Sequence, residues 1–317
     1  MAKCKFRVAC AQFEPTLSDV DSSIQTCEEL LNENEAALLK KDDGDGPLGV
    51  MMFPELAFTG YTFDSREDIE KLVEYDDETN AKTFCFLRKI AARFDCLVAC
   101  GYIRGVREDE IEGRPRIFNA MQVVDSKEKL VLRINKHHLY CLDESWADED
   151  TNGFTSSTLR VKAKGMDDVV HFFSIPTTFG ICMDINPYRF EAPWDAFEFA
   201  NHILKEKSSL VLFSSAWTNA HPDDSDDVKE VVPPALDTWN YWISRLFPLL
   251  QNNDVPQRAC VFANRIGMEN KIHFVGSSIV FEIQDAGKEE RDFEKTIAVR
   301  GTLDNSSAGI LIASVSC

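Results

Sequence analysis

The sequence predicts an α/β (α+β layered) fold in which two stacked β-sheets are flanked by helices. Strand-like segments outnumber helix-like segments by roughly two to one, and they occur both in hairpin-like clusters and in β-α-β units. The chain has 317 residues, of which 44% are hydrophobic, so it can bury a large core. No repeat of fixed period and no linker rich in Pro, Gly or Ser divides it. We therefore expect a single domain over residues 1–317.

The first half of the chain alternates strands with amphipathic helices. Residues 5–13 alternate apolar and polar side chains, which is typical of a half-buried strand. Asp19 and Asp21 are suitable N-caps for the helix that follows them. The elements expected after this strand are a helix over 22–41, a buried strand over 49–53, a helix over 79–94, and strands over 96–103, 117–124 and 130–134.

The second half continues in the same way. Residues 210–214 read LVLFS, a continuous apolar run that predicts a strand buried on both faces. The other elements expected here are strands over 169–175 and 178–183, helices over 189–205 and 238–252, and strands over 259–263, 273–283 and 309–314.

The chain is strongly acidic. It has 34 Lys and Arg residues against 53 Asp and Glu residues, a formal net charge of -19. This charge repels phosphate backbones and anionic lipids, so we expect no nucleic-acid partner and no membrane partner. No apolar run approaches the roughly 20 residues that a spanning helix needs, and the first residues lack the apolar segment of a secretory signal. The charge serves solubility, or it forms an acidic mouth that attracts cationic substrates.

The chain contains ten cysteines, none of them in a Cys-x-x-Cys pair. A disulfide framework is unusual in a chain of this length without a secretory signal, so we expect most of the thiols to be reduced and buried. This predicts a reducing compartment, the cytoplasm or the nucleus. His137-His138 lacks nearby residues at the spacing of metal ligands, and we expect no metal.

Three segments place reactive side chains where a strand ends. Glu55 follows the apolar strand over 49–53, Lys136 follows the strand over 130–134, and Cys182 lies near the end of the segment 178–183. Open α/β sheets place their sites at such strand ends. Each residue alone has an ordinary interpretation, as a turn carboxylate, a solvated lysine or a core thiol. Together, a thiol beside a base and a cation becomes an activated nucleophile.

These segments resemble the Glu-Lys-Cys signature of the nitrilase superfamily. The similar stretches are Phe53–Tyr61, Lys136 with His138-Leu139, Gly180–Asp184 and, for the first strand, Val8–Phe13. Longer runs are similar to the fungal-type branch of protein N-terminal asparagine/glutamine amidohydrolases: Cys182–Pro193, Leu139-Tyr140 with Asp143–Trp146, and Asp237–Trp242. The stretch Ile185–Tyr188 departs from the common superfamily pattern, in which an arginine falls nearer to the cysteine.

The resemblance implies a four-layer α-β-β-α sandwich and a thiol mechanism without metal or organic cofactor. Cys182 attacks the side-chain amide of an N-terminal Asn or Gln, and Glu55 transfers the proton and then activates water. Lys136 and the backbone N–H of Met183 bind the oxyanion. Glu144 is the candidate for the second carboxylate that orients the lysine. The substrates implied are proteins or peptides with a free N-terminal Asn or Gln, and the products enter the N-degron pathway of protein degradation.

A free α-amino group places a positive charge beside the scissile amide, so a selective pocket should offer carboxylates near the nucleophile. The candidates are Asp184, Glu191 and Asp143 with its neighbour Glu144. Asp184 fits equally well as a carboxylate that binds nearby backbone. Trp217 and Asn219 follow the strand over 210–214 and can line the same mouth, although core packing is the simpler interpretation of Trp217.

Two functions of other kinds remain open. The first is hydrolysis of a small amide, a nitrile or an N-carbamoyl amino acid on the same fold. A free amino acid would require an arginine clamp on its α-carboxylate, and Arg189 is a candidate for it. The second is a binding module without activity, against which the presence of all three reactive residue types argues.

Overall fold

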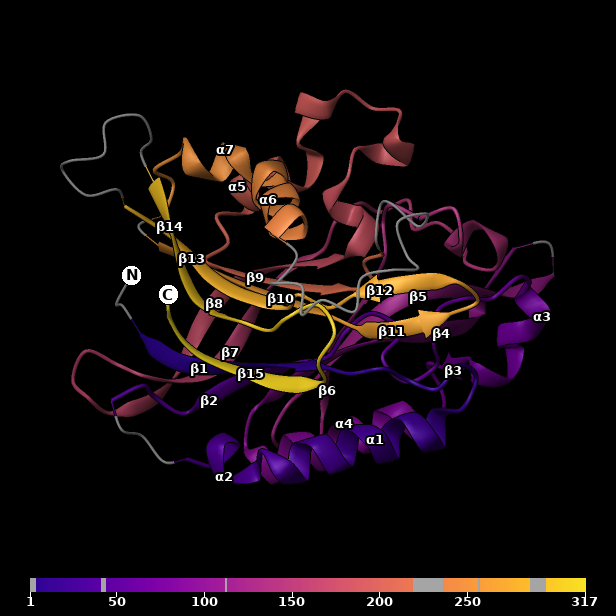
Figure 1. Ribbon diagram of the computed structural model, residues 1–317, viewed down its shortest axis with the longest axis horizontal. Coiled ribbons are helices and arrows are strands. Elements are labelled where there is room, and N and C mark those ends of the chain that lie inside the picture. Colours follow the sequence, from indigo (N-terminus) through magenta and orange to yellow (C-terminus); the bar gives the residue numbers. More distant parts are fainter. Residues whose placement is uncertain (1–3, 41–43, 112, 219–235, 256, 286–294) are drawn as a thin grey trace.

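The computed structural model describes residues 4–40, 44–111, 113–218, 236–255, 257–285 and 295–317. Two β-sheets lie face to face, and helices cover the outer face of each, which gives four layers (Figure 1). The sheets meet at the residue pair Lys5 and Lys164, which links the two layers. The expected four-layer α-β-β-α arrangement is confirmed.

The first sheet carries the amino-terminal half of the chain. Strands β1, β2 and β4 run parallel to one another, whereas β15, β5 and β6 pair antiparallel with their neighbours. In order across the sheet these strands are β15 (Gly309–Ser316), β1 (Lys5–Gln12), β2 (Leu48–Met52), β4 (Leu97–Ile111), β5 (Arg114–Val124) and β6 (Leu130–Asn135), with β3 (Glu74–Tyr75) beside β4. The helices of this half are α1 (Val20–Glu33), α2 (Glu35–Leu38), α3 (Arg66–Ile69) and α4 (Lys82–Phe94).

The second sheet carries the carboxyl-terminal half, and its central strands β8, β9 and β10 are parallel. Its order is β7 (Ser156–Lys164), β8 (Val170–Ile181), β9 (Leu210–Ser215), β10 (Gln257–Asn264), β13 (Ile279–Asp285) and β14 (Lys295–Thr302). The helices α5 (Glu198–Glu206), α6 (Leu236–Arg245) and α7 (Phe247–Leu250) lie on its outer face (Figure 1). A separate hairpin is formed by β11 (Ile266–Glu269) and β12 (Ile272–Val275).

Side-chain alternation along the strands explains the four layers. In β1, Val8 and Cys10 belong to the core between the sheets, whereas Ala9 and Ala11 belong to the core beneath α1 and α4. In the second sheet, alternate residues of β9 and β10 face α5, α6 and α7 instead. Because successive side chains of a strand point to opposite faces, each sheet contributes to two cores.

The element boundaries differ from expectation where the backbone turns sharply. The expected strands over 169–175 and 178–183 form the single strand β8, and residues 182–185 form a 3₁₀ turn. The helix expected over 189–205 is restricted to α5, because Arg189, Phe190 and Phe197 have positive φ angles. The segment 273–283 divides into β12 and β13 at Gly276. Four strands lie outside the expected elements: β3, β7, β11 and β14.

The N-cap Asp19 predicted for the helix over 22–41 is confirmed, since its carboxylate accepts a hydrogen bond from the Ser22 N–H at 3.0 Å, but α1 begins at Val20. It ends earlier, at Glu33, and α2 follows as a separate short helix. Within the described ranges, no helix is long and apolar enough to cross a membrane.

Candidate active site

The ends of three strands bring Glu55, Lys136 and Cys182 into one region between the sheets. Glu55 follows β2, Lys136 directly follows β6, and Cys182 directly follows β8. All three side chains are buried. The site therefore takes its base and its cation from one sheet and its thiol from the other.

Lys136 lies between two carboxylates. Its Nζ atom is 2.6 Å from Glu55 Oε1 and 2.6 Å from Asp143 Oδ2, and all three side chains are inaccessible to solvent. Burial disfavours the ammonium, but the charges of Asp143 and Glu55 outweigh it and raise the pKa of Lys136 above its ordinary value. The lysine is therefore a fixed positive charge.

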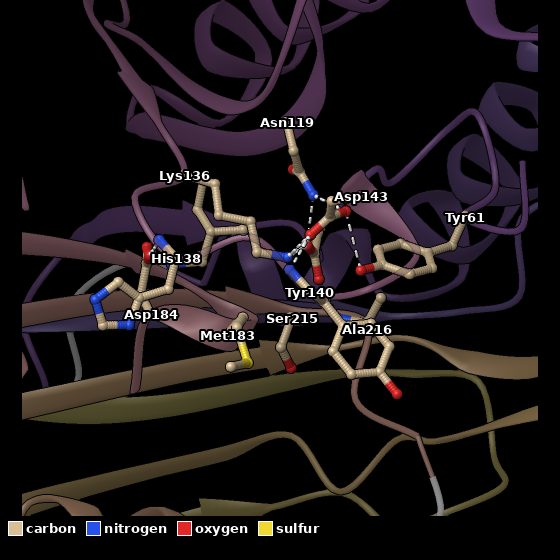
Figure 2. A network of polar contacts seen from close by, with 12 residues as sticks. Tyr61, Asn119, Lys136, His138, Tyr140, Asp143, Met183, Asp184, Ser215 and Ala216 are labelled. Carbon is tan, nitrogen blue, oxygen red and sulfur yellow. Dashed lines mark hydrogen bonds and ion pairs between the residues drawn. The ribbon is translucent and has the colours of Figure 1, made fainter. Parts of the chain in front are cut away.

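Asp143 is held by more than the lysine. Its Oδ1 atom accepts hydrogen bonds from the Asn119 amide at 3.0 Å and from the Tyr61 hydroxyl at 3.1 Å. Its Oδ2 atom also accepts the Tyr140 N–H at 2.9 Å. Figure 2 shows the amide and the phenol pointing at this carboxylate with the lysine alongside. Asp143 is thus fully satisfied by donors and fixes the position of the lysine.

Glu55 has a donor on each of its oxygens. Oε1 accepts Lys136 and the Asn119 amide, the latter at 2.7 Å, and Oε2 accepts the Ala216 N–H at 2.8 Å. Burial raises the pKa of Glu55 above its ordinary value, Lys136 opposes this rise, and Asp143 adds to it. A carboxylate with a raised pKa in a buried site is suited to accept a proton from a thiol.

Gly101 on β4 allows the backbone at Glu55 to approach this closely. A Cβ atom at Gly101 would lie 2.6 Å from the Glu55 Cα atom and 2.7 Å from the Leu56 nitrogen. The Gly101 N–H instead donates to the Pro54 carbonyl at 3.2 Å. A side chain at this position would therefore displace the base.

Cys182 begins the 3₁₀ turn Cys182–Ile185 and has a φ of 45°, a left-handed conformation that few residues other than glycine adopt. Burial raises the pKa of its thiol well above the ordinary value, and Glu55 adds to this rise. Lys136 and the Ala216 N–H act in the opposite direction. The thiol is therefore protonated at rest, and its reaction requires a base.

Of the two interpretations of Asp184, the structure supports the carboxylate that binds nearby backbone over the contact with the substrate. Its Oδ1 atom accepts the N–H groups of His137 and His138 at 3.0 and 2.8 Å, and its Oδ2 atom accepts the Ile181 N–H at 2.8 Å. The carboxylate is buried and both of its oxygens accept backbone N–H groups, so it is not available to bind a substrate. It ties the segment after Lys136 to the turn that carries Cys182.

The structure also corrects Glu144 as the carboxylate that orients Lys136. The Glu144 side chain is 48% exposed, and its Oε1 atom lies 3.9 Å from Arg189 Nη2. In the 3₁₀ turn Asp143–Ser145 the aspartate faces inward and its neighbour faces outward, so Asp143 occupies the expected position.

Of the remaining predicted residues, Met183 lies in the site, and the others are exposed, packed in a core or outside the described part of the chain. Glu191 is exposed. Trp217 packs against Tyr241 and Trp242, in agreement with its interpretation as a core residue. Met183 is buried and directly follows Cys182 in the turn. Asn219 lies outside the described residues.

The sequence analysis missed Asn119 and Ala216, and it gave no role to Tyr61. Asn119 is a fully buried polar residue in the otherwise apolar stretch Ile117–Met121 of β5, and that contrast was a usable signal. Ala216 acts through its backbone, which carries no signal in the residue type. Among the described residues no three His, Cys, Asp or Glu side chains are grouped to hold a metal ion.

Comparisons with known proteins agree on one family. Residues 7–177 match the model of the carbon-nitrogen hydrolase family. A protein N-terminal amidase of Schizosaccharomyces pombe is 28% identical over 288 residues, which cover 87% of this chain and 91% of that protein. A protein of the same name from Saccharomyces cerevisiae is 29% identical over 220 residues, or 68% of this chain and 45% of that protein.

Solved structures show the same fold. A crystal structure of an N-terminal amidase with an Asn-Glu-Ala peptide superimposes with a TM-score of 0.82 at 20% identity, covering 100% of this chain and 99% of that one. A carbon-nitrogen hydrolase from Helicobacter pylori gives a TM-score of 0.65 at 14% identity, covering 98% and 88%.

Proposed function

The chain belongs to the carbon-nitrogen hydrolase family, and we propose that it hydrolyses the side-chain amide of N-terminal asparagine and glutamine in proteins and peptides. The observation that carries this proposal is the buried cluster in which Lys136 lies 2.6 Å from both Glu55 and Asp143 at the strand ends that also carry Cys182. The two relatives from yeasts, each a protein N-terminal amidase, support the choice of substrate.

In the acylation step, Glu55 removes the proton from the Cys182 thiol, and the sulfur attacks the amide carbon of the substrate side chain. Lys136 and the Met183 N–H stabilise the negative oxygen that forms. The carbon–nitrogen bond then breaks, Glu55 returns the proton to the departing nitrogen as ammonia leaves, and a thioester with Cys182 remains.

In the deacylation step, Glu55 removes a proton from a water molecule, which attacks the thioester carbon. The carbon–sulfur bond breaks, and the proton returns to the Cys182 sulfur. The product carries N-terminal Asp or Glu, and the thiol and the carboxylate return to their initial states. No redox change occurs in either step.

The charge of the cluster supports a substrate with a free α-amino group. Two carboxylates, Glu55 and Asp143, surround one ammonium, Lys136, so the buried cluster carries a net negative charge. This charge attracts an ammonium beside the scissile amide and repels a free carboxylate at the same place. Peptides should therefore be preferred over free asparagine, and acetylation of the amino group should remove the advantage.

Arg189 does not support the alternative of a free amino acid substrate. Its side chain is 51% exposed and lies 3.9 Å from Glu144 and 3.8 Å from Glu149. Its charge thus already faces two carboxylates.

The free thiols, most of them buried, are suited to a reducing compartment, and we place the reaction in the cytoplasm.

Ammonia release from four substrates tests the proposal. These are a short peptide with N-terminal Asn, its Gln counterpart, the acetylated Asn peptide and free asparagine. We expect turnover of the first two and little of the others. Equal kcat/KM for the free and the acetylated peptide would overturn the proposal and favour hydrolysis of small amides.

A further inference from the structure

A second buried ion pair lies outside the cluster around Cys182. Arg265 follows β10, and Glu269 ends β11, in the hairpin next to the second sheet. Arg265 Nη2 lies 2.5 Å from Glu269 Oε1, and both side chains are almost fully buried. In a buried pair, the cost of desolvating both charges offsets much of their Coulomb attraction, so such a pair is weak evidence for stability. The contacts of Glu269 indicate a positioning role instead.

Glu269 uses its other oxygen to hold the loop that follows Glu55. Oε2 accepts the N–H groups of Tyr61 and Thr62, both at 2.9 Å, and the Thr62 hydroxyl at 3.2 Å. Gly60 has a φ of 79°, and a Cβ atom there would lie 3.0 Å from Glu269 Oε1. The nearest neighbours of that Cβ atom would be Leu17 Cδ1 at 2.6 Å and the Leu17 Cα atom at 2.9 Å, so the loop depends on glycine at this point.

Tyr61 carries this restraint into the active site. Its hydroxyl donates to Asp143 Oδ1 at 3.1 Å, and Lys136 Nζ lies 5.8 Å from its ring centre (Figure 2). Its ring packs edge-on against Phe274 at 5.9 Å between centroids, and the Arg265 guanidinium lies 4.0 Å from the Phe274 ring. The ion pair thus holds Tyr61 twice, through its backbone and through its ring.

We propose that Tyr61 and Glu269 are positioning residues of the reaction: Glu269 fixes Tyr61, and the Tyr61 hydroxyl holds the oxygen of Asp143 that Lys136 does not contact. The inference that Asp143 must be held for the chemistry rests on the proposed function. The positioning of Tyr61 by Glu269 can be tested without that function, provided that Cys182 is a reactive thiol beside this cluster.

Loss of the Tyr61 hydroxyl should make the thiol harder to ionise. The charged or titratable groups that act on this hydroxyl are Asp143, Glu55, Cys182 and Lys136. Without its phenol donor, Asp143 presents more uncompensated negative charge to the sulfur, which opposes formation of a thiolate. The same charge attracts the substrate ammonium, so the change should appear as a lower kcat and a shifted pH dependence, and not as a rise in KM.

The first test compares Tyr61→Phe with Tyr102→Phe. Tyr102 is a matched control, because it is also buried and its hydroxyl has no hydrogen-bond partner among the described residues. We expect Tyr61→Phe to slow alkylation of Cys182 by iodoacetamide, measured by peptide mapping, on the order of tenfold at neutral pH and to shift its pH profile upward. The kcat should fall by a similar factor with no rise in KM. Equal alkylation profiles in the two variants would overturn the role of Tyr61.

The second test separates positioning from folding. The double variant Arg265→Met/Glu269→Leu removes both buried charges together, so it avoids leaving one of them unpaired. We expect the variant to stay folded, with a lower melting temperature because the Tyr61 and Thr62 N–H groups lose their acceptor, and to show the slow alkylation of Tyr61→Phe. Adding Tyr61→Phe to this variant should cause little further loss, because both changes release the same contact. Two outcomes would overturn the role of Glu269. The first is a wild-type alkylation rate of Cys182 in the folded double variant, and the second is a further loss of this rate on adding Tyr61→Phe as large as in the wild type.

The two proposals can fail separately. If the wild type does not deamidate N-terminal Asn or Gln but the alkylation profiles shift as expected, the substrate assignment fails and the positioning role stands. If the wild type deamidates these peptides and Tyr61→Phe behaves as the wild type in kcat and alkylation, the positioning role fails alone.

Discussion

Replacement of Asp143 by Asn is the sharpest test of how the cluster is held. The carboxylate accepts four donors, two on each oxygen: the Tyr61 hydroxyl and the Asn119 amide on Oδ1, Lys136 and the Tyr140 N–H on Oδ2. Asparagine has the same shape, but its amide nitrogen is itself a donor. It would therefore face the two donors that one of the Asp143 oxygens accepts. In addition, Lys136 keeps only Glu55 as an ionic partner.

Both stability and activity should fall. Removing one partner of a buried ion pair costs about 3–5 kcal/mol, and we expect the lower end because Glu55 still compensates the lysine. The activity should fall on the order of 10²-fold. With Asp143 gone, Lys136 acts on Glu55 alone, and the loss of the neighbouring negative charge lowers the proton affinity of the base.

The adjacent substitution Glu144→Gln is the control. This side chain is half-exposed and contacts Arg189 at 3.9 Å, so removal of its charge should change kcat by less than about twofold, as is usual for exposed pairs. Initial rates of ammonia release and thermal unfolding at neutral pH measure both effects. Full activity in Asp143→Asn, or a loss in Glu144→Gln as large as that in Asp143→Asn, would refute the reasoning.

Three further predictions follow from the same geometry. Cys182→Ala and Cys182→Ser should abolish turnover with little change in melting temperature, and activity in the Ala variant would exclude Cys182 as the nucleophile. Glu55→Gln and Lys136→Ala should each lower the single-turnover rate on the order of 10²-fold or more, with losses that do not add in the double variant. Burial lowers the pKa of His138 to about 4. The folded state therefore resists protonation that the unfolded state accepts, and stability should fall by up to about 3 kcal/mol as the pH drops from about 6.5 to 4. Urea unfolding across this range should show a smaller decline in His138→Gln, and equal declines would contradict the assignment.

The sequence predicted the layers of the fold better than the boundaries of its elements. The balance of strand-like and helix-like segments predicted two stacked sheets flanked by helices, as the structure has them. The half-buried strand predicted over 5–13 was wrong, because β1 is buried on both faces: Val8 and Cys10 belong to one core, and Ala9 and Ala11 to the other. The helix expected over 189–205 was wrong because its first half turns through positive φ angles at Arg189 and Phe190, which apolar periodicity does not reveal. In β7, exposed polar residues such as Arg160 alternate with buried ones in a segment that the analysis left without structure.

Residue type and position at a strand end were enough to predict Glu55, Lys136 and Cys182 as the reactive residues, but not the residues that hold them. The structure brings Glu55 and Lys136 into contact, as their places at strand ends suggested. The choice between Asp143 and Glu144 depends on which side of one 3₁₀ turn faces inward, and spacing does not determine this. The choice between a substrate contact and a backbone contact for Asp184 stayed open, because the three N–H groups that it binds come from two segments that spacing does not bring together.

The central claim is that Cys182 forms a thioester with the side chain of an N-terminal Asn or Gln. The most direct measurement is rapid acid quenching of the enzyme during turnover of an Asn-initiated peptide, followed by mass spectrometry of the intact protein and of its proteolytic fragments. We expect an adduct with the mass of the peptide less ammonia, located on Cys182. Ammonia release with no such adduct at any quench time, or an adduct on another of the ten cysteines, would contradict it.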